Sequence, residues 1–393
     1  MTYGNKHAVY ARIAGYGDAV YIDLCNDEWQ AIEIKADGWR VINDPPVKFV
    51  RSNGMLPLPM PKPGGSLEAL KPFLNVGEDG FILAIACVVG TLKPYGPYPI
   101  LSAQGEQGST KTTFVRILRS CVDPSKAPVR SSPKDERDLI LSAQNSHILA
   151  FDNLSDIKIW FSDALCRIST GGGYATRQLY TDGQEIVFQA MRPIILNSIS
   201  QIVFRHDLVD RCIFCHLDPI PPSKRRLESD IRAEFDKVHP YVLGALCDAV
   251  STALRRKNEV AFDTLPRMAD FATWVQAAEP ALPWEDGQFI ALYNDNREGA
   301  IGQAIESDPV AYAITIFMED ESEWIGTATE LLEVLNQDMP EEIRKIEGWP
   351  ESAIALGLKL SRISAFLRES GIEIERDGRT RKDRIIKIRN LIR

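Results

Sequence analysis

A glycine-rich segment at residues 104–113 constrains the fold of this chain more than any other feature. It reads Gln-Gly-Glu-Gln-Gly-Ser-Thr-Lys-Thr-Thr and lies between two apolar runs, at 98–102 and 114–118. A strand, a glycine-rich turn and a lysine that opens a helix form the arrangement that cradles nucleotide phosphates. The usual pattern is G-x-x-x-x-G-K-[ST], and Thr110 replaces the second glycine here. The segment therefore predicts an α/β fold around a phosphate-binding loop; the alternative is an ordinary turn that caps a helix.

The residues of this loop predict contacts with ATP and Mg²⁺. Gly105 and Gly108 let the backbone approach phosphates closely, Lys111 reaches the β- and γ-phosphates, and the Thr112 hydroxyl contacts Mg²⁺. The full set expected to contact the nucleotide is Gly105, Glu106, Gln107, Gly108, Ser109, Thr110, Lys111, Thr112 and Thr113.

Composition places the chain among ordinary globular proteins. It has 393 residues, of which 45% are hydrophobic and 25% charged, enough for two or three domains. No apolar run approaches the roughly 20 residues that cross a bilayer, and the first residues lack the apolar core of a signal peptide. The seven cysteines show no framework spacing, which suits a reducing compartment. We expect a cytoplasmic protein with no membrane partner.

Pattern changes along the chain predict four regions. Residues 1–62 form a small β-rich domain, a meander over 8–52 that ends in a Pro-rich linker at 56–65. Residues 63–222 form the α/β core, in which the longest apolar run, 81–89, predicts a buried helix. Residues 223–323 form a helical extension, and 324–393 a winged-helix-like domain that ends in a β pair. The strands expected in the core are 98–102, 147–151, 193–196 and 212–217.

Charge is distributed unevenly. The net charge is −9 overall, yet residues 359–393 carry 11 Lys/Arg against 5 Asp/Glu. A basic tail on an acidic body indicates one element that faces nucleic acid, and a solvated basic helix is the alternative. The residues expected to contact DNA there are Arg379, Arg381, Lys382 and Arg384.

Three further segments fit an ATP site. The apolar run 148–152 ends in Asp152, the position at which a P-loop domain holds Mg²⁺. Asn153 follows it in place of the usual acid and cannot take a proton. It could still position water, or the base could come from elsewhere, with Asp156 a weak candidate. The run 193–197 ends in Asn197, whose amide could hold the γ-phosphate or the attacking water; a turn-forming Asn is the alternative. Arg211 could act on a neighbouring subunit's γ-phosphate, or form a surface ion pair.

Five motifs in order carry a family resemblance: 105–113, 151–153, 170–180, 194–197 and 207–211. Together they resemble the ATPase of superfamily 3 helicases, a branch of the AAA+ proteins, and especially the helicase modules of phage and mobile-element primase-helicases. The resemblance implies an AAA+ core, ATP with Mg²⁺, and a hexameric homo-oligomeric ring. Lys111, Asp152, Asn153 and Asn197 would act from one chain and Arg211 from the next.

The resemblance also implies DNA contacts within the core. In that family the segment between the strands that end here at Asp152 and Asn197 forms a hairpin that lines the ring's pore, and residues 180–188 contain the Asp182-Gly183 turn that a hairpin favours. Arg167 and Arg177 would contact phosphates there, and Tyr174 would stack on a base. The chain departs from the family at Thr110, at Asn153 and at 171–173, which reads Gly-Gly-Gly where the family has Gly-Gly-Asp.

Two functions follow. The first is a ring-forming DNA helicase or translocase that acts on single-stranded or forked DNA in phage or mobile-element replication, with any primase or polymerase on a separate chain. The alternative is an AAA+ DNA-binding adaptor or replication initiator that uses ATP as a structural switch. A third possibility, a nucleotide kinase, would leave the winged-helix tail unexplained.

Overall fold

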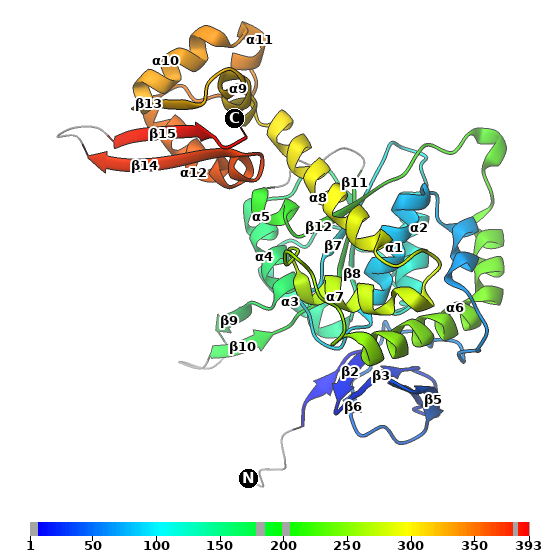
Figure 1. Cartoon of the computed structure of the whole chain (residues 1–393). Coiled ribbons are helices and arrows are strands. Elements are labelled where there is room, and N and C mark those ends of the chain that lie inside the picture. Colours follow the sequence, from blue (N-terminus) through cyan, green and yellow to red (C-terminus); the bar gives the residue numbers. More distant parts are fainter. Residues whose placement is uncertain (1–6, 178–184, 199–204, 380–383, 393) are drawn as a thin grey trace. The chain divides into compact units, whose positions relative to one another are not determined.

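The computed structural model describes residues 7–177, 185–198, 205–379 and 384–392 (Figure 1). The chain divides by its contacts into two units, which are described separately below. The first comprises 1–202 with 211–296, and the second 203–210 with 297–393. The four-region division expected from the sequence stays a prediction.

The N-terminal strands form the expected meander. An antiparallel four-stranded sheet runs in the order β2-β3-β4-β5, and β1 pairs in parallel with β6. β3 and nearly all of β4 are buried, because this sheet shares one hydrophobic core with α1, α2, α6 and α7. The bounds are β1 Val9–Tyr10, β2 Ile13–Tyr16, β3 Ala19–Asp23, β4 Ala31–Lys35, β5 Gly38–Ile42 and β6 Lys48–Phe49.

The centre of the first unit is a parallel sheet in the order β12-β7-β11-β8. Arg130 extends it beyond β8 by a parallel bridge to Phe151. The strands are almost continuously apolar and buried, as strands covered on both faces must be, and Figure 1 shows α1 and α2 on one face and α3 and α4 on the other. The bounds are β7 Ile100–Gln104, β8 Leu149–Leu154, β11 Ile194–Ser198, β12 Cys212–His216, α1 Glu78–Thr91, α2 Lys111–Ser120, α3 Glu136–Asn145 and α4 Ile159–Thr170.

This layout confirms the α/β class and the four expected strands to within about two residues at each end. The buried helix expected at 81–89 is α1. Because the strands are parallel, the carboxyl ends of β7, β8 and β11 meet at one edge of the sheet, where the glycine-rich segment 104–113 begins. A hairpin of β9 (Gly173–Arg177) and β10 (Glu185–Gln189) lies between α4 and β11 in sequence.

Helices complete the first unit. They are η1 Leu67–Phe73, η2 Pro222–Lys224, α6 Glu228–Arg256, α7 Ala269–Ala278 and η3 Glu279–Ala281, and α8 Gln288–Ser307 leads into the second unit. The Pro-rich segment lacks regular structure, as expected, but it packs against α6. The Lys62 amide donates to Pro240 O (2.8 Å), and a Cβ on Gly244 would lie 1.9 Å from Lys62 O. Glycine at 244 therefore lets the two chain segments touch.

The second unit has the helix-then-hairpin layout expected for a winged helix. Its sheet runs in the order β13-β15-β14, with α12 directly before the β14–β15 hairpin. Thr327 and Glu330 form a capping box that starts α10. The bounds are α5 His206–Val209, α9 Pro309–Glu319, β13 Glu323–Thr327, α10 Ala328–Asp338, α11 Glu341–Arg344, α12 Ala353–Glu369, β14 Ile372–Arg379 and β15 Arg384–Asn390.

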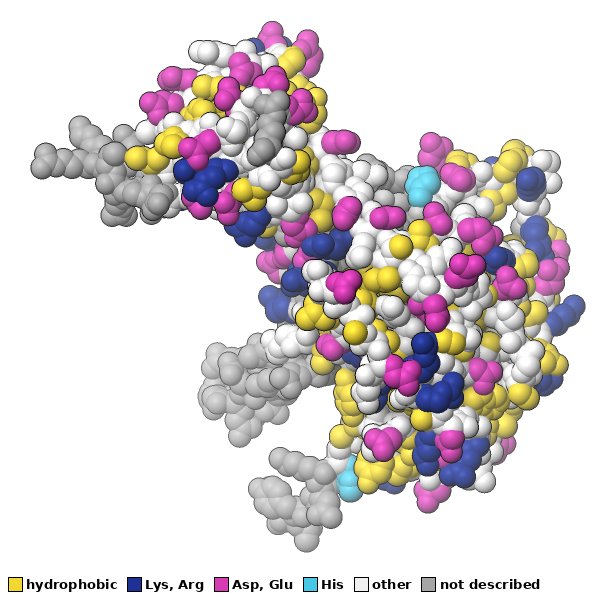
Figure 2. Space-filling model, in the orientation of Figure 1, with side chains coloured by type: hydrophobic (Ala, Val, Ile, Leu, Met, Phe, Trp, Pro, Cys, Tyr) yellow, Lys and Arg dark blue, Asp and Glu magenta, His cyan; other side chains and the backbone are white. Residues whose placement is uncertain are grey.

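Among the described helices, none by itself has the length and apolar character of a membrane span. The bent pair of η1 and α1 meets that test only jointly, and α1 is buried in the core. Figure 2 shows acidic and basic side chains interspersed over the visible face.

Candidate functional site

The loop between β7 and α2 has the backbone of a phosphate cradle. Gly105 and Gly108 take positive φ angles of 157° and 88°, and a Cβ on Gly105 would lie 2.3 Å from Leu217 O. Thr110, in the place of the usual glycine, also has a left-handed conformation with φ 62°. A threonine costs about 1–2 kcal/mol in that region, so the departure from the motif is accommodated as local strain. The loop keeps its shape without the second glycine.

Lys111 folds back onto this loop. Its Nζ donates to Gly105 O and Glu106 O (2.7 Å each) and to Ser109 Oγ (3.3 Å). The side chain is largely buried, and this burial lowers the pKa of Lys111 while the Asp152 carboxylate opposes the shift. The ammonium group is therefore held at the loop by acceptors that an anion could replace.

Thr112, Asp152 and Asn197 meet at the edge of the sheet. The Thr112 hydroxyl lies 3.1 Å from Asp152 Oδ2, and Asn197 Nδ2 donates to Asp152 Oδ1. β8 and β11 are parallel neighbours, which places their carboxyl ends side by side. Asn197 Oδ1 is buried and has no hydrogen-bond partner among the described residues. The three side chains that the sequence predicted from separate motifs thus lie in contact.

A cavity of about 980 Å³ opens beside these side chains, within the size range of small-molecule sites. Asp152 is the only carboxylate among the described residues that line it, against five cationic side chains. Its lining consists of Lys71, Pro72, Phe73, Leu74, Asn75, Gln107, Gly108, Thr110, Lys111, Thr112, Thr113, Asp152, Asn153, Asn197, Pro219, Ile220, Pro221, Lys224, Arg225, Arg226 and Ile231. The lining thus combines polar and cationic side chains with apolar ones.

Several residues that line or support this cavity were not predicted from the sequence. Asn75 Nδ2 donates to Ser109 O (3.1 Å) and to Asp218 O (2.6 Å), which ties the loop to the segment after β12. Arg225 reaches over the loop, since its NH2 lies 3.7 Å from the Cβ position of Gly108. The run Lys224-Arg225-Arg226, separated by six residues from the strand predicted at 212–217, was the signal available in the sequence. Arg226 is held in an ion pair with Glu234 at 2.5 Å.

Other predicted residues lie apart from the cavity or at its margin. Asn153 lines the cavity and has a left-handed backbone with φ 55°. Its backbone N–H donates to Asp152 Oδ1 (2.9 Å). Arg211 directly precedes β12, at the amino end of the sheet, and does not line the cavity. Arg167 on α4 forms an ion pair with Glu136 at 2.5 Å. Its DNA contact stays a prediction.

For the remaining residues that were predicted to contact DNA, the structure describes only the backbone, or the residue lies outside the described ranges. Tyr174 and Arg177 lie on β9, where Arg177 pairs in register with Glu185 of β10. Arg379 ends β14 and Arg384 begins β15. Arg381, Lys382 and the expected turn at 182–183 lie outside the described residues.

Comparison with solved structures gives distant likenesses. The apo C-terminal region of NrS-1 matches over 92% of this chain and 94% of that chain, with 11% identity and a TM-score of 0.35. A structure of JCV helicase with a bound small molecule matches over 53% of this chain and 67% of that chain, with 12% identity and a TM-score of 0.27. TM-scores this low carry no argument about activity.

Family models give a stronger result. No curated protein matches the chain significantly. The model of the actinomycete integrative conjugative element replication protein (AICE RepA) matches residues 67–283, and the model of the AICE RepA C-terminal domain matches 310–392. The first match spans the glycine-rich loop, the parallel sheet and most of the cavity, more than half of the 393 residues. The chain therefore belongs to the actinomycete integrative conjugative element replication protein family.

Proposed function

We propose that this protein is an ATP-hydrolysing DNA helicase or translocase of the superfamily 3 type within the AAA+ proteins, which acts in the replication of its mobile element. One observation carries the proposal. Lys111, Thr112, Asp152 and Asn197 converge on one cavity at the carboxyl edge of a parallel sheet, the place where open α/β sheets bind ligands.

The residues of the cavity fit ATP with Mg²⁺. The Thr112 hydroxyl and the Asp152 carboxylate are oxygen donors, which Mg²⁺ prefers. The cationic side chains of the lining suit phosphates, and its apolar side chains, such as Phe73 and Ile231, suit a nucleobase. The buried and unpartnered Asn197 Oδ1 fits a site completed by a donor such as water, since an unsatisfied buried acceptor costs about 1–3 kcal/mol.

Each side chain then has a role. Lys111 exchanges its loop carbonyls for phosphate oxygens and offsets their charge. Thr112 and Asp152 would hold Mg²⁺, which when bound would supply positive charge at the phosphates. Asn197 fixes the Asp152 carboxylate by hydrogen bonding and orients water. Arg225 supplies a cation above the loop.

A ring of identical subunits completes the proposal. Arg211 lies at the end of the sheet away from its own cavity, so it can reach only the nucleotide of another copy. Single-stranded or forked DNA is the substrate in this proposal, contacted by the β9–β10 hairpin and by the winged-helix unit. A separate primase or polymerase would act beside it.

One observation favours the alternative of an ATP-switched adaptor or replication initiator. Asp152, the only carboxylate among the described lining residues, is the proposed Mg²⁺ ligand. It is therefore not available as a general base. Asp156 is exposed and does not line the cavity. Hydrolysis then depends on a base from a neighbouring copy, or is slow.

An ATPase assay of the purified full chain, with and without single-stranded DNA, tests the proposal. We expect hydrolysis that DNA stimulates and that Lys111→Ala abolishes, while the unfolding midpoint stays close to that of the wild type. Unchanged hydrolysis by Lys111→Ala would show that residues 105–113 are only a turn. Tight ATP binding without turnover, with or without DNA, would support the adaptor.

A further inference from the structure

A second cavity, of about 460 Å³, opens in the first unit away from the ATP cavity. It lies between the β2–β3 turn, the loop that follows α1, the end of α6 and Trp274 of α7. The loop after α1 precedes β7, so this cavity lies toward the amino end of the parallel sheet. The site described above uses the carboxyl end.

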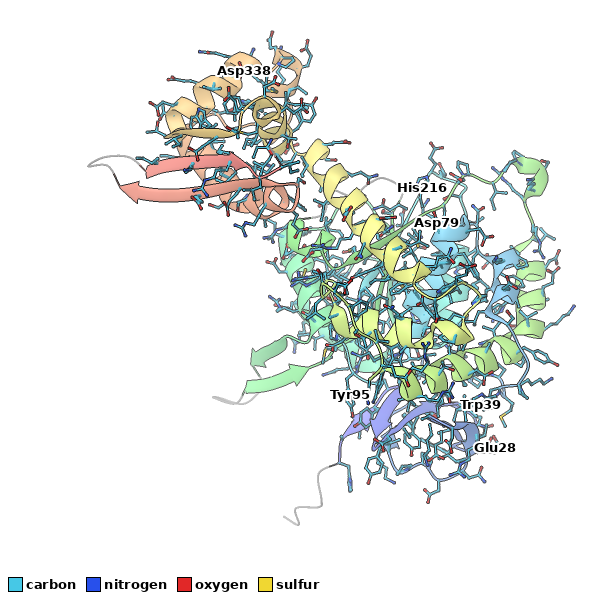
Figure 3. The ribbon with its side chains drawn as sticks, in the orientation of Figure 1. Glu28, Trp39, Asp79, Tyr95, His216 and Asp338 are labelled. Atoms are coloured by element: carbon cyan, nitrogen blue, oxygen red, sulfur yellow. The ribbon has the colours of Figure 1, made fainter. Side chains whose placement is uncertain are left out.

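Two exposed tyrosines line this second cavity. Tyr16 is 61% exposed and Tyr95 is 56% exposed, although aromatic side chains of this size normally bury most of their area. Tyr95 is held in place beside β2, since its hydroxyl donates to Gly15 O (3.1 Å) (Figure 3). A Cβ on Gly15 would lie 2.9 Å from Pro94 and 3.0 Å from the Tyr95 ring. Glycine at 15 therefore allows the ring to sit against the strand with its other side open.

Lysines accompany these rings. Lys93 and Lys257 line the cavity, and Asp18 is the only carboxylate among its described lining residues. Lys257 is exposed at the end of α6, and Lys93 Nζ donates to Gly96 O (3.1 Å). Aromatic faces with adjacent cations are the combination that binds single-stranded nucleic acid without sequence preference. The two ammonium groups favour an anionic strand over an uncharged peptide.

The loop that carries Tyr95 also contacts the base of the β9–β10 hairpin. The Tyr98 amide donates to Ser169 O at the end of α4 (2.9 Å). A Cβ on Gly96 would lie 2.8 Å from the sulfur of Met191, which follows β10, and so would a Cβ on Gly171. The second cavity and the hairpin are thus joined through one short, closely packed segment, and a nucleic-acid strand bound to the hairpin base would have this cavity beside it.

We propose that Tyr16 and Tyr95, with Lys93 and Lys257, form a stacking platform for single-stranded nucleic acid. In this proposal the N-terminal sheet contributes directly to DNA binding. The proposal deepens the proposed function and rests on it for the identity of the substrate. It assigns the tyrosine rings to bases and the lysines to phosphates.

Fluorescence anisotropy with a labelled oligothymidylate and the full chain tests the platform. Since each stacked base contributes about 1–3 kcal/mol, Tyr16→Ala and Tyr95→Ala should each weaken binding roughly five- to a hundredfold. Tyr16→Phe, which keeps the ring, should bind as the wild type does. Lys257→Ala should lower the salt slope by about 0.7, the value for one phosphate contact with a single strand.

Trp29→Ala is the matched control, because Trp29 is also an exposed aromatic (56%) of the N-terminal region and does not line the cavity. Far-UV circular dichroism and the affinity for a fluorescent ATP analogue check that every variant is folded. The proposal is overturned if the folded double variant Tyr16→Ala/Tyr95→Ala binds oligothymidylate as tightly as Trp29→Ala does. Tyrosine-dependent binding of a proline-rich peptide, with no effect on oligothymidylate, would also overturn it.

The outcome is separable from that of the proposed function. If the chain does not hydrolyse ATP but its binding of oligothymidylate depends on the two tyrosines, the proposed helicase function is refuted and the stacking platform stands. If the chain hydrolyses ATP with DNA stimulation, but substitution of both tyrosines leaves its DNA affinity unchanged, the stacking platform is refuted and the proposed helicase function stands.

Discussion

Arg12→Met should destabilise the first unit by several kcal/mol, because it leaves the buried Asp123 carboxylate with only the more distant Arg119 as a cationic partner. Arg12 and Asp123 are almost fully buried, and Arg12 Nε lies 3.2 Å from Asp123 Oδ1. The same carboxylate accepts from the amides of His147 (3.2 Å) and Ile148 (3.1 Å), and lies 3.5 Å from Arg119 NH2. One carboxylate thus joins the N-terminal strands, the end of α2 and the start of β8, the two core elements that carry the phosphate loop and Asp152.

The magnitude follows from burial. Breaking a buried ion pair by removing one partner costs about 3–5 kcal/mol. The variant also removes the donors to Asp23 O (3.1 Å) and Leu56 O (2.9 Å). Arg40→Met is the matched control, since its side chain is 70% exposed beside Glu33 and should cost less than about 1 kcal/mol.

Urea unfolding at neutral pH measures the difference between the two variants. Arg12→Met/Asp123→Asn should recover little of the loss, because removal of the carboxylate leaves the buried Arg119 without its anionic partner. If Arg12→Met unfolds within about 1 kcal/mol of Arg40→Met, the buried pair contributes little and the reasoning fails.

Acid unfolding gives a second measurement. Burial raises the pKa of Asp123, but Arg12 and Arg119 lower it more, so the net shift is downward. The stability linked to a lowered carboxyl pKa is complete above the unfolded value, about 3.9, and is lost as pH falls through the folded value. Without Arg12 the folded pKa rises, so the variant should begin to unfold at a higher pH than the wild type.

Three further predictions concern the ATP site. Thr110→Gly should change unfolding stability by about 0 to +1.5 kcal/mol, because relief of left-handed strain is partly offset by the flexibility of glycine; a large loss would show that the threonine side chain holds the loop. Arg225→Ala should weaken binding of a fluorescent ATP analogue up to about tenfold, whereas Arg226→Ala, already ion-paired, should change it less; equal effects would remove Arg225 from the site. Mixing Arg211→Ala with Lys111→Ala chains should restore some ATPase, and no recovery in demonstrably mixed oligomers would leave Arg211 a structural role only.

Local patterns made much of this fold predictable. Apolar runs that end in Asp152 and Asn197 fixed the strands, and the parallel arrangement then required both side chains to lie near Lys111. The glycine-rich loop was also predictable from local sequence, because its backbone conformation depends on a few adjacent residues of the right type.

Side-chain partners across the chain were not predictable. Asn75 meets Asp218 and Arg12 meets Asp123, and no periodicity links residues more than 100 positions apart. The Pro-rich segment was predicted to be a linker because proline disfavours helices and the hydrogen-bonded ladders of β-sheets. Its packing on α6, however, depends on Gly244. Both cases depend on tertiary contacts that only the folded chain brings together.

The register of the sheet supports the proposal that Arg211 acts on the nucleotide of a second copy of the chain. β12 pairs with β7 in parallel, with Cys212 opposite Ile100 and His216 opposite Gln104. Arg211 therefore lies beyond one end of β7, and the phosphate loop begins at the other. Five strand residues separate the two levels by about 16 Å. An arginine so placed cannot serve the nucleotide of its own subunit, so a role for Arg211 in hydrolysis requires a second copy of the chain.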